Sequence, residues 1–221
     1  MRAMILAAGR GERMRPLTDR TPKPLLRAGG KALIEYHLER LRIAGITQVV
    51  INIAWLGAQI RDALGDGSRY GLPIAYSDEG DYALETGGGI FNALPLLGEE
   101  PFIVISGDVW VEYPYGELPQ KLASADLAHL VLVPNPAFHP RGDFGLQRGR
   151  ITEAGAEPYT YANIGIYRPE LFAGCQPGRF ALAPLLYKSI GRLSGEAFNG
   201  RWHNLGNPAQ LSILDAELQQ G

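Results

Sequence analysis

The sequence predicts an α/β fold of three layers, in which helices cover both faces of a mostly parallel sheet. Two observations carry this prediction. Short apolar segments rich in β-branched residues alternate with segments whose apolar residues recur at helical spacing, as in successive β–α units. The 28 glycines and 16 prolines are spread along the chain rather than clustered, which indicates many turns between short elements.

The first half of the chain alternates most regularly. Residues 4–8 form an apolar run that ends in Gly-Arg-Gly, as a buried strand entering a loop does. Residues 34–44 carry a helical pattern, and Gly45 provides a natural C-cap. The further predicted elements are a strand over 49–53, a helix over 56–64, a strand over 74–77, a helix over 88–97 and strands over 102–105 and 127–133.

After about residue 135 the pattern changes. Short β-like pieces over 143–152 and 161–167 flank turns that contain proline and glycine, and helices are expected over 181–192 and 208–219. We expect this second half to extend the same sheet. The chain is therefore predicted to form one domain over 1–221, with a first half over 1–135 and a second half over 136–221.

Composition narrows the possible partners and location. With 221 residues, 46% of them hydrophobic and 20% charged, the chain has the makeup of an ordinary globular domain with one large core. A net charge of −2 gives no indication of a nucleic-acid or anionic-membrane partner, and no apolar run is long enough to span a bilayer. Cys175 is the only cysteine, and the short apolar N-terminal run is followed at once by charged residues, unlike a signal peptide. We expect a cytoplasmic protein.

The polar motifs lie where ligands bind in open α/β sheets, beyond the carboxyl ends of the strands. After the first strand, Gly9 and Gly11 let the backbone approach a phosphate and turn its N–H groups inward, and Arg13 and Lys23 add positive charge. A dinucleotide-binding fingerprint would need a glycine where the chain has Met14, and no P-loop sequence occurs. A simple turn with solvated arginines is the alternative, and the fixed register of the motif disfavours it.

The run from Leu6 to Thr18, followed after three residues by Pro22-Lys23-Pro24, has the spacing Leu-x-Ala-Gly-x-Gly-x-Arg-x-x-Pro-Leu-Thr-x-x-x-Pro-Lys-Pro. This spacing resembles the signature of the sugar-phosphate nucleotidyltransferases, and the resemblance continues over essentially the whole chain. It implies a Rossmann-like fold of the nucleotide-diphospho-sugar transferase type. It also implies that the half over 1–135 binds a nucleoside triphosphate, while the half over 136–221 faces a sugar 1-phosphate.

The resemblance assigns roles residue by residue. Arg13 is implied to stabilise the pentavalent α-phosphorus, and Lys23 to sit at the reacting phosphates. These roles agree with the physics of nucleotidyl transfer, which depends on positioning and charge neutralisation. The residues implied to bind the nucleotide are Leu6, Ala7, Ala8, Gly9, Gly11, Glu79, Gly87 and Asp108.

The implied cofactor is Mg²⁺. Asp108 follows the 102–105 strand in a Gly-Asp pair and matches the family's metal-binding aspartate. The second family ligand is usually an aspartate in a Trp-x-Asp-x-Gly-Thr stretch, where this chain has Asn204 and Asn207 in place of the aspartate and the threonine. An amide oxygen is a legitimate ligand for a hard cation, so we expect metal binding that is weakened but not abolished.

Recognition of the base and the sugar is less clearly encoded. Glu79 is a candidate acceptor for a base N–H, with a solvated loop carboxylate as the alternative, and Gly87 is a candidate N–H donor at a helix start. Glu157 lies in a Glu-Pro pair that lacks the lysine of the family's Glu-Lys-Pro, and Asn163 lies on the strand that usually borders the sugar. Arg27 and Arg201 are two alternatives for the missing cation.

The stretch Leu-Glu-Thr-Gly-Gly-Gly over 84–89 resembles the N-acetylmuramate-1-phosphate uridylyltransferases of peptidoglycan recycling. UTP and N-acetylmuramate 1-phosphate are therefore the implied substrates, and the early end of the chain after Asn204 implies no further domain. One alternative is a mannose-1-phosphate guanylyltransferase or another hexose-1-phosphate enzyme. An alternative of another class is a catalytically weak nucleotide-binding regulator. The four histidines share no metal-ligand spacing and are expected to be structural or exposed, and the oligomeric state is left open.

Overall fold

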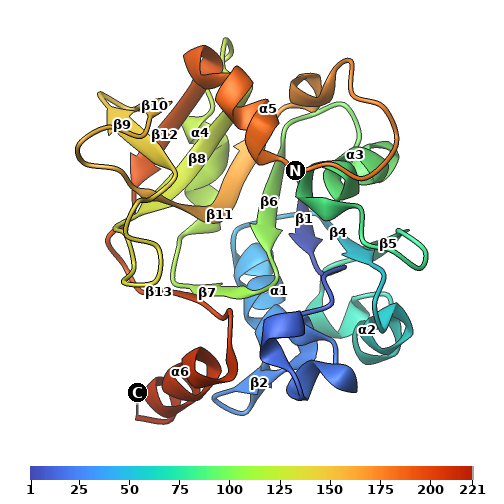
Figure 1. The fold of residues 1–221 in the computed structure, drawn as a ribbon. Coiled ribbons are helices and arrows are strands. Elements are labelled where there is room, and N and C mark those ends of the chain that lie inside the picture. The colour runs from blue at the N-terminus through green and yellow to red at the C-terminus, as the bar shows by residue number, and fades with distance from the viewer. Residues whose placement is uncertain (221) are drawn as a thin grey trace.

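The computed structural model describes residues 1–220 and is built around a nine-stranded sheet in the order β5-β4-β1-β6-β11-β8-β12-β10-β9 (Figure 1). The sheet crosses both halves of the chain, because β11 of the second half pairs with β6 of the first. Its strands are β1 (Arg2–Leu6), β4 (Gln48–Ile53), β5 (Ile74–Asp78), β6 (Phe102–Ser106), β8 (Ala128–Val133), β9 (Phe144–Gln147), β10 (Arg150–Glu153), β11 (Thr160–Tyr167) and β12 (Leu193–Ala197).

Most of the strands point the same way, which confirms the predicted mostly parallel sheet. β1 pairs in parallel with β4 and β6, β4 with β5, and β8 with β12. Only β11 and β10 run opposite to their neighbours in this sheet. The carboxyl ends of β1, β4, β5 and β6 consequently meet at one edge, and this edge carries the loops in which the polar motifs lie.

Helices cover both faces of the sheet, as expected for three layers (Figure 1). On one face, apolar residues of α1 and α2 pack against alternate residues of β1 and β4, such as Ile5 and Ile51. On the other face, α3 packs against the intervening residues, such as Met4 and Val50, and α5 contributes to the same apolar cluster. The helices are α1 (Leu33–Ile43), α2 (Gly57–Leu64), α3 (Glu85–Leu97), α4 (Leu118–Lys121), α5 (Ala183–Lys188) and α6 (Pro208–Gln220).

Two short ribbons lie outside the main sheet, and the sequence patterns did not predict them. β2 (Arg27–Ala28) pairs with β3 (Lys31–Ala32), and β7 (Val109–Val111) pairs with β13 (Trp202–Asn204). A separate apolar cluster joins them to α6 and contains Met14, Leu205 and Trp110. Met14, the residue that breaks the dinucleotide fingerprint, is fully buried there and so anchors the glycine loop in the core.

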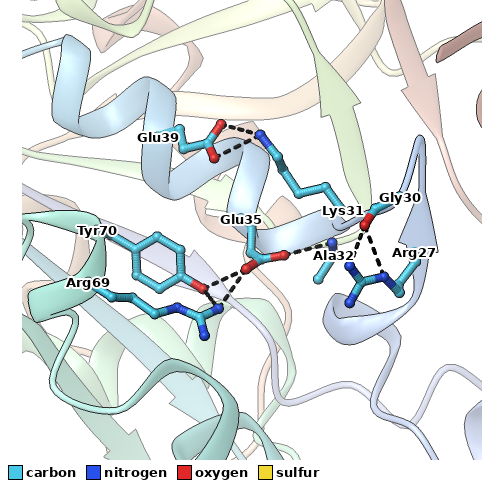
Figure 2. Close-up of polar contacts among 8 residues, drawn as sticks. All are labelled: Arg27, Gly30, Lys31, Ala32, Glu35, Glu39, Arg69 and Tyr70. Atoms are coloured by element: carbon cyan, nitrogen blue, oxygen red, sulfur yellow. Dashed lines mark hydrogen bonds and ion pairs between the residues drawn. The ribbon is translucent and has the colours of Figure 1, made fainter. Parts of the chain in front are cut away.

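Helix α1 is fixed at its start by Glu35 (Figure 2). One carboxylate oxygen of Glu35 accepts a hydrogen bond from the backbone N–H of Ala32 at 2.9 Å. The other accepts from the Tyr70 hydroxyl at 2.8 Å and from the Arg69 guanidinium at 2.6 Å. Although burial opposes ionisation, these partners hold the pKa of Glu35 below its usual value. The first turn of α1 is thereby tied to the segment that follows α2.

His37, on the buried side of α1, is hydrogen-bonded to the first residue of β7. Its Nε2 lies 2.8 Å from the carbonyl oxygen of Val109, which can only accept, so Nε2 carries the proton. Its Nδ1 lies 2.9 Å from the Tyr115 hydroxyl and accepts from it. Burial lowers the pKa of His37 to about 4, despite the hydrogen bond to Val109. This neutral histidine is structural, as expected.

The structure contains the predicted elements, but the bounds of two predicted helices differ from the prediction. The helix predicted over 181–192 is interrupted: α5 ends at Lys188, and a separate 3-10 turn, Ile190–Arg192, follows it. Strand β12 begins directly afterwards and must reach β8, so the chain cannot continue as a helix. The 88–97 helix begins earlier than its apolar pattern, at Glu85. Among residues 1–220, no helix has the length and apolarity required to cross a bilayer.

Candidate active site

A cavity of about 800 Å³ opens at the carboxyl edge of β1, β4, β5 and β6. The loop after β1, the segment around Lys23, the loop between β5 and α3, and the turn after β6 form its walls. Nine of the residues assigned from the sequence line this one cavity: Leu6, Ala7, Ala8, Gly9, Gly11, Arg13, Lys23, Glu79 and Asp108. The position agrees with the general rule that ligands of open α/β sheets bind beyond the strand ends.

Gly9 and Gly11 occupy different surroundings in the first loop. Gly11 adopts a left-handed conformation with φ 64°, and a Cβ there would lie 2.9 Å from Thr18 Cγ2. The Thr18 hydroxyl also donates to the Gly11 carbonyl oxygen at 2.8 Å, so Gly11 is needed for the loop's own shape. A Cβ on Gly9 would meet nothing within 4 Å. The protein itself therefore leaves the space beside Gly9 free for a bound group.

Lys23 and Asp108 form an ion pair on the cavity wall. Lys23 Nζ lies 2.7 Å from Asp108 Oδ2, and the Ser106 hydroxyl donates to Asp108 Oδ1 at 2.6 Å. Burial by itself would raise the pKa of Asp108, but Lys23, Ser106 and the nearby Arg13 hold it below its usual value. Asp108 is therefore an ionised carboxylate beside two cations, an arrangement suited to a polyanionic ligand and its metal.

The donor set for a metal is sparse, and it fits Mg²⁺. Among the described residues, no group of three or more His, Cys, Asp or Glu side chains gathers in one place. Asn204 lies in β13 beside the segment that carries Asp108, since the Leu205 N–H donates to the Asp108 carbonyl oxygen at 2.9 Å. Asn204 Oδ1 is buried and has no hydrogen-bond partner within residues 1–220. One carboxylate and one free amide oxygen are appropriate for a hard cation that takes its remaining ligands from phosphate and water.

Asn52, which the sequence analysis assigned no role, connects two loops of the cavity. It lies at the end of β4 and is 3% exposed. Its Oδ1 accepts from the Ala7 N–H at 2.7 Å, and its Nδ2 donates to Glu79 Oε1 at 2.6 Å. The only available signal was an asparagine at the carboxyl end of a buried strand. Asn52 fixes the end of β1 relative to the loop after β5.

Both oxygens of Glu79 already have protein partners. Oε1 accepts from Asn52, and Oε2 accepts from the Leu84 N–H at 2.6 Å. Burial raises the pKa of Glu79 even though these two hydrogen bonds favour its ionised form. Glu79 lines the cavity, but its evident task is to hold the loop that leads into α3, and any contact with a base would be additional.

Gly87 does not line the cavity; it is a packing position. A Cβ on Gly87 would lie 2.6 Å from the Phe180 ring, and one on Gly88 would lie 2.2 Å from the Gly178 carbonyl oxygen. The Gly88 N–H donates to the Phe180 carbonyl oxygen at 2.9 Å. The glycines at the start of α3 thus allow a segment from the second half of the chain to pack closely against this helix. That segment brings Arg179 to the cavity wall, where it pairs with Glu85 at 2.9 Å.

The residues assigned to the sugar lie apart from this cavity. Glu157 is exposed between β10 and β11. Asn204, which was assigned to the metal, also lines a separate hollow of about 310 Å³ rather than the cavity that Asp108 lines. Asn163 lies at an irregularity of β11 between Tyr161 and Gly165, with a left-handed φ of 59°. A non-glycine residue held in this conformation inside a strand is a feature of functional sites.

Neither alternative for the missing cation faces the cavity. Arg27 bends back within its own ribbon, where Nε donates to the Gly30 carbonyl oxygen at 3.1 Å (Figure 2). Arg201 pairs with Glu112 and with Glu217, each at 3.2 Å. The additional cations on the cavity wall are Arg10 and Arg179, which sequence reasoning did not select. Arg179 in particular reaches the cavity through contacts between segments that are distant in sequence.

Comparison with known proteins agrees with this geometry. The nucleotidyl transferase family model matches residues 2–154, which is more than half of the chain. The chain belongs to this family of sugar-phosphate nucleotidyltransferases, as its first loop predicted, and it is an enzyme of the nucleotidyltransferase class.

Two relatives of similar length have the same name and match almost the whole chain. The chain is 51% identical to the N-acetylmuramate alpha-1-phosphate uridylyltransferase of Neisseria meningitidis serogroup B, covering 98% of this chain and 97% of the relative. It is 36% identical to the enzyme of the same name from Caulobacter vibrioides, covering 99% and 97%. A solved structure from Bacillus anthracis superposes with a TM-score of 0.87 at 22% identity, covering 100% and 96%, which confirms the nucleotide-diphospho-sugar transferase fold.

Proposed function

We propose that the protein transfers UMP from UTP to N-acetylmuramate 1-phosphate and releases pyrophosphate, using Mg²⁺. A phosphate oxygen of the sugar 1-phosphate attacks the α-phosphorus of UTP. A new P–O bond forms there as the bond to the β-phosphate breaks. We further propose a cytoplasmic enzyme in which residues 1–135 bind the nucleotide and residues 136–221 face the sugar.

The observation that carries this proposal is the convergence of Arg13, Lys23 and Asp108 on one cavity beside the open backbone at Gly9. In-line transfer needs the triphosphate to be held in position and its growing charge to be neutralised. The Gly9–Gly11 loop suits the first task because the backbone can approach the phosphates closely. Arg13 and Lys23 suit the second, as charge accumulates on the departing pyrophosphate.

Asp108 and Asn204 would hold Mg²⁺, which supplies additional positive charge at the phosphates when bound. Lys23 pairs with Asp108 at 2.7 Å, so this carboxylate already has a counter-ion before a metal binds. The free amide oxygen of Asn204 is the second protein ligand in this proposal.

Asn163 and Glu157 are proposed to contact the sugar. The left-handed conformation of Asn163 is the structural feature that supports this role. N-Acetylmuramic acid carries a lactyl carboxylate, so its pocket must provide a cation or backbone N–H donors in addition to those that bind the phosphate. The identity to the Neisseria and Caulobacter enzymes supports this choice of sugar over other hexose phosphates.

The test is a matrix of four nucleoside triphosphates against several sugar 1-phosphates, with pyrophosphate release as the readout. UTP with N-acetylmuramate 1-phosphate should give the highest kcat/KM, exceeding N-acetylglucosamine 1-phosphate by well over tenfold, because a site built for a polar group rejects analogues that lack it. Equal use of both sugars refutes the sugar assignment. A preference for GTP with mannose 1-phosphate supports the alternative suggested by a mannose-1-phosphate guanylyltransferase from Mycobacterium tuberculosis, which is 36% identical over 70% of this chain but only 38% of its own length.

A further inference from the structure

The cavity contains a cation that the proposed mechanism has not used. Arg10 lies between Gly9 and Gly11 and lines the cavity, and its guanidinium sits over the Trp55 ring, 4.8 Å from the ring centre. Trp55 comes from the loop between β4 and α2, so two segments distant in sequence meet here. An arginine stacked on an aromatic ring keeps its charge and loses much of its conformational freedom.

The Trp55 ring is itself fixed by the glycine loop. Its Nε1–H donates to the Thr18 carbonyl oxygen at 3.1 Å. The hydroxyl of the same threonine, which is 1% exposed, donates to the carbonyl oxygen of Gly11, the residue after Arg10. The backbone of the loop and the ring that supports the Arg10 side chain are therefore held by one buried residue.

Two cationic side chains near Arg10 already form ion pairs with carboxylates of the protein. Arg15 pairs with Asp19 at 3.2 Å, and Lys23 pairs with Asp108 at 2.7 Å. Within residues 1–220, Arg10 forms no ion pair with a carboxylate. It presents a positive charge that the protein orients but does not neutralise.

We propose that Arg10 binds the β- and γ-phosphates of the nucleoside triphosphate and that Trp55 is the residue that positions it. This proposal rests on the proposed function. In in-line transfer, the attacking and leaving oxygens lie on opposite sides of the α-phosphorus. The strands of the second half of the chain, assigned to the sugar, lie beyond β6 in the sheet, whereas α2, which follows Trp55, lies near β4 and β5 on the opposite side of β1 (Figure 1). The proposal therefore places Arg10 on the side toward which pyrophosphate leaves.

Calorimetric titration with UTP and with UMP, each with Mg²⁺, tests this proposal without requiring turnover. Arg10→Ala should weaken UTP binding by about tenfold or more, the scale of a charge-assisted hydrogen bond, and change UMP binding by less than about twofold. Arg10→Lys keeps the charge but not the planar stacking and should fall between Arg10→Ala and wild type. Arg20→Ala is the matched control: it removes an exposed arginine of the same loop region that does not line the cavity, and it should change neither affinity.

The positioning role of Trp55 is tested by the UTP affinity of two Trp55 variants. Trp55→Leu should weaken UTP binding in the same selective way, and Trp55→Phe, which restores an aromatic face, should recover most of the loss. In the reverse reaction, Arg10→Ala should raise the KM for inorganic pyrophosphate and leave the KM for the nucleotide sugar unchanged.

Unchanged UTP affinity in Arg10→Ala overturns the proposal, and so does an equal loss for UTP and UMP. A wild-type protein that binds UTP more tightly than UMP but releases no pyrophosphate contradicts the proposed function alone, because the affinity comparison still decides the role of Arg10.

Discussion

The ammonium of Lys23 and the carboxylate of Asp108 lie 2.7 Å apart on the cavity wall. The cation assigned to the phosphates and the carboxylate assigned to the metal are therefore direct partners. Their side chains are only 10% and 32% exposed, so neither charge is well solvated by itself. Lys23 favours the ionised form of Asp108, and any ligand that enters the cavity must share or replace this contact.

Asp108→Asn and Arg13→Ala should each lower kcat by at least ~10²-fold, the scale of one electrostatic stabiliser. Asp108→Asn should in addition reduce the free energy of unfolding by about 1–3 kcal/mol, because Lys23 is left without its partner. Pyrophosphate release and urea unfolding measure the two effects. Glu99→Gln, at an exposed loop carboxylate, is the control and should change neither. Near-normal turnover in both site variants would rule out the mechanism.

Gly9→Ala should separate a phosphate-binding loop from a simple turn. The added Cβ meets no protein atom within 4 Å, so the free energy of unfolding should change by less than about 0.5 kcal/mol. UTP affinity should nevertheless fall by about tenfold or more, because the methyl group occupies the space assigned to the phosphates.

Gly11→Ala and Gly191→Ala are the two variants with which Gly9→Ala is compared. Gly11→Ala should cost about 1–2 kcal/mol of stability, because φ is 64° and Thr18 is close. A Cβ on Gly191 would also meet nothing within 4 Å, but Gly191 does not line the cavity. Gly191→Ala should therefore change neither the free energy of unfolding nor the UTP affinity. Unchanged UTP affinity in Gly9→Ala would favour the simple turn.

Asn52→Ala should reduce the free energy of unfolding by about 1–3 kcal/mol, because it leaves the Ala7 N–H and Glu79 without their buried partner. The KM for the nucleoside triphosphate should rise as well, since two walls of the cavity lose their connection. Thermal unfolding and initial-rate kinetics measure these effects. If stability falls while the KM for the triphosphate stays at the wild-type value, the bridge is purely structural.

Asn204→Asp should lower the Mg²⁺ concentration needed for half-maximal activity, because it adds a negative charge to a sparse site. Asn204→Ala should raise that concentration. Asn199→Asp, on an exposed turn after β12, adds the same charge away from the site and controls for overall charge. Activity that appears only in Asn204→Asp, with none in the wild type, would support the nucleotide-binding regulator.

Stability should decrease in mild acid because of His37. Its pKa in the folded protein is about 4, against 6.5 ordinarily, so the unfolded state binds the proton more readily. The stabilisation is complete above about pH 6.5 and is lost progressively as the pH falls toward 4, by up to about 3 kcal/mol. Urea unfolding at a series of pH values measures this loss. His37→Gln should flatten the curve between pH 6.5 and 4, and an unchanged slope would contradict the assignment.

Local patterns were sufficient for much of the fold and for part of the site. The runs that became β1, β4 and β6 are apolar and β-branched over their own length, and the glycine loop is contiguous in sequence, so both were predictable. The ribbon of β7 and β13 was not, because its pairing joins Val109 to Asn204 and depends on the whole chain being folded. Arg179 was missed for the same reason. Gly87 was assigned to the nucleotide because sequence does not reveal that the Phe180 ring lies against it.

The junction of Leu205 with Asp108 has a consequence for synthesis of the protein on the ribosome. The glycine loop, Lys23 and Asp108 are translated before β13 and Gly206, and Gly206 also lines the cavity. Domains can begin to fold during translation, but a contact cannot form before both of its partners exist. A nascent chain in which β13 has not yet been translated therefore lacks the contact between Leu205 and Asp108. The cavity gains this part of its wall only after Gly206 has been translated.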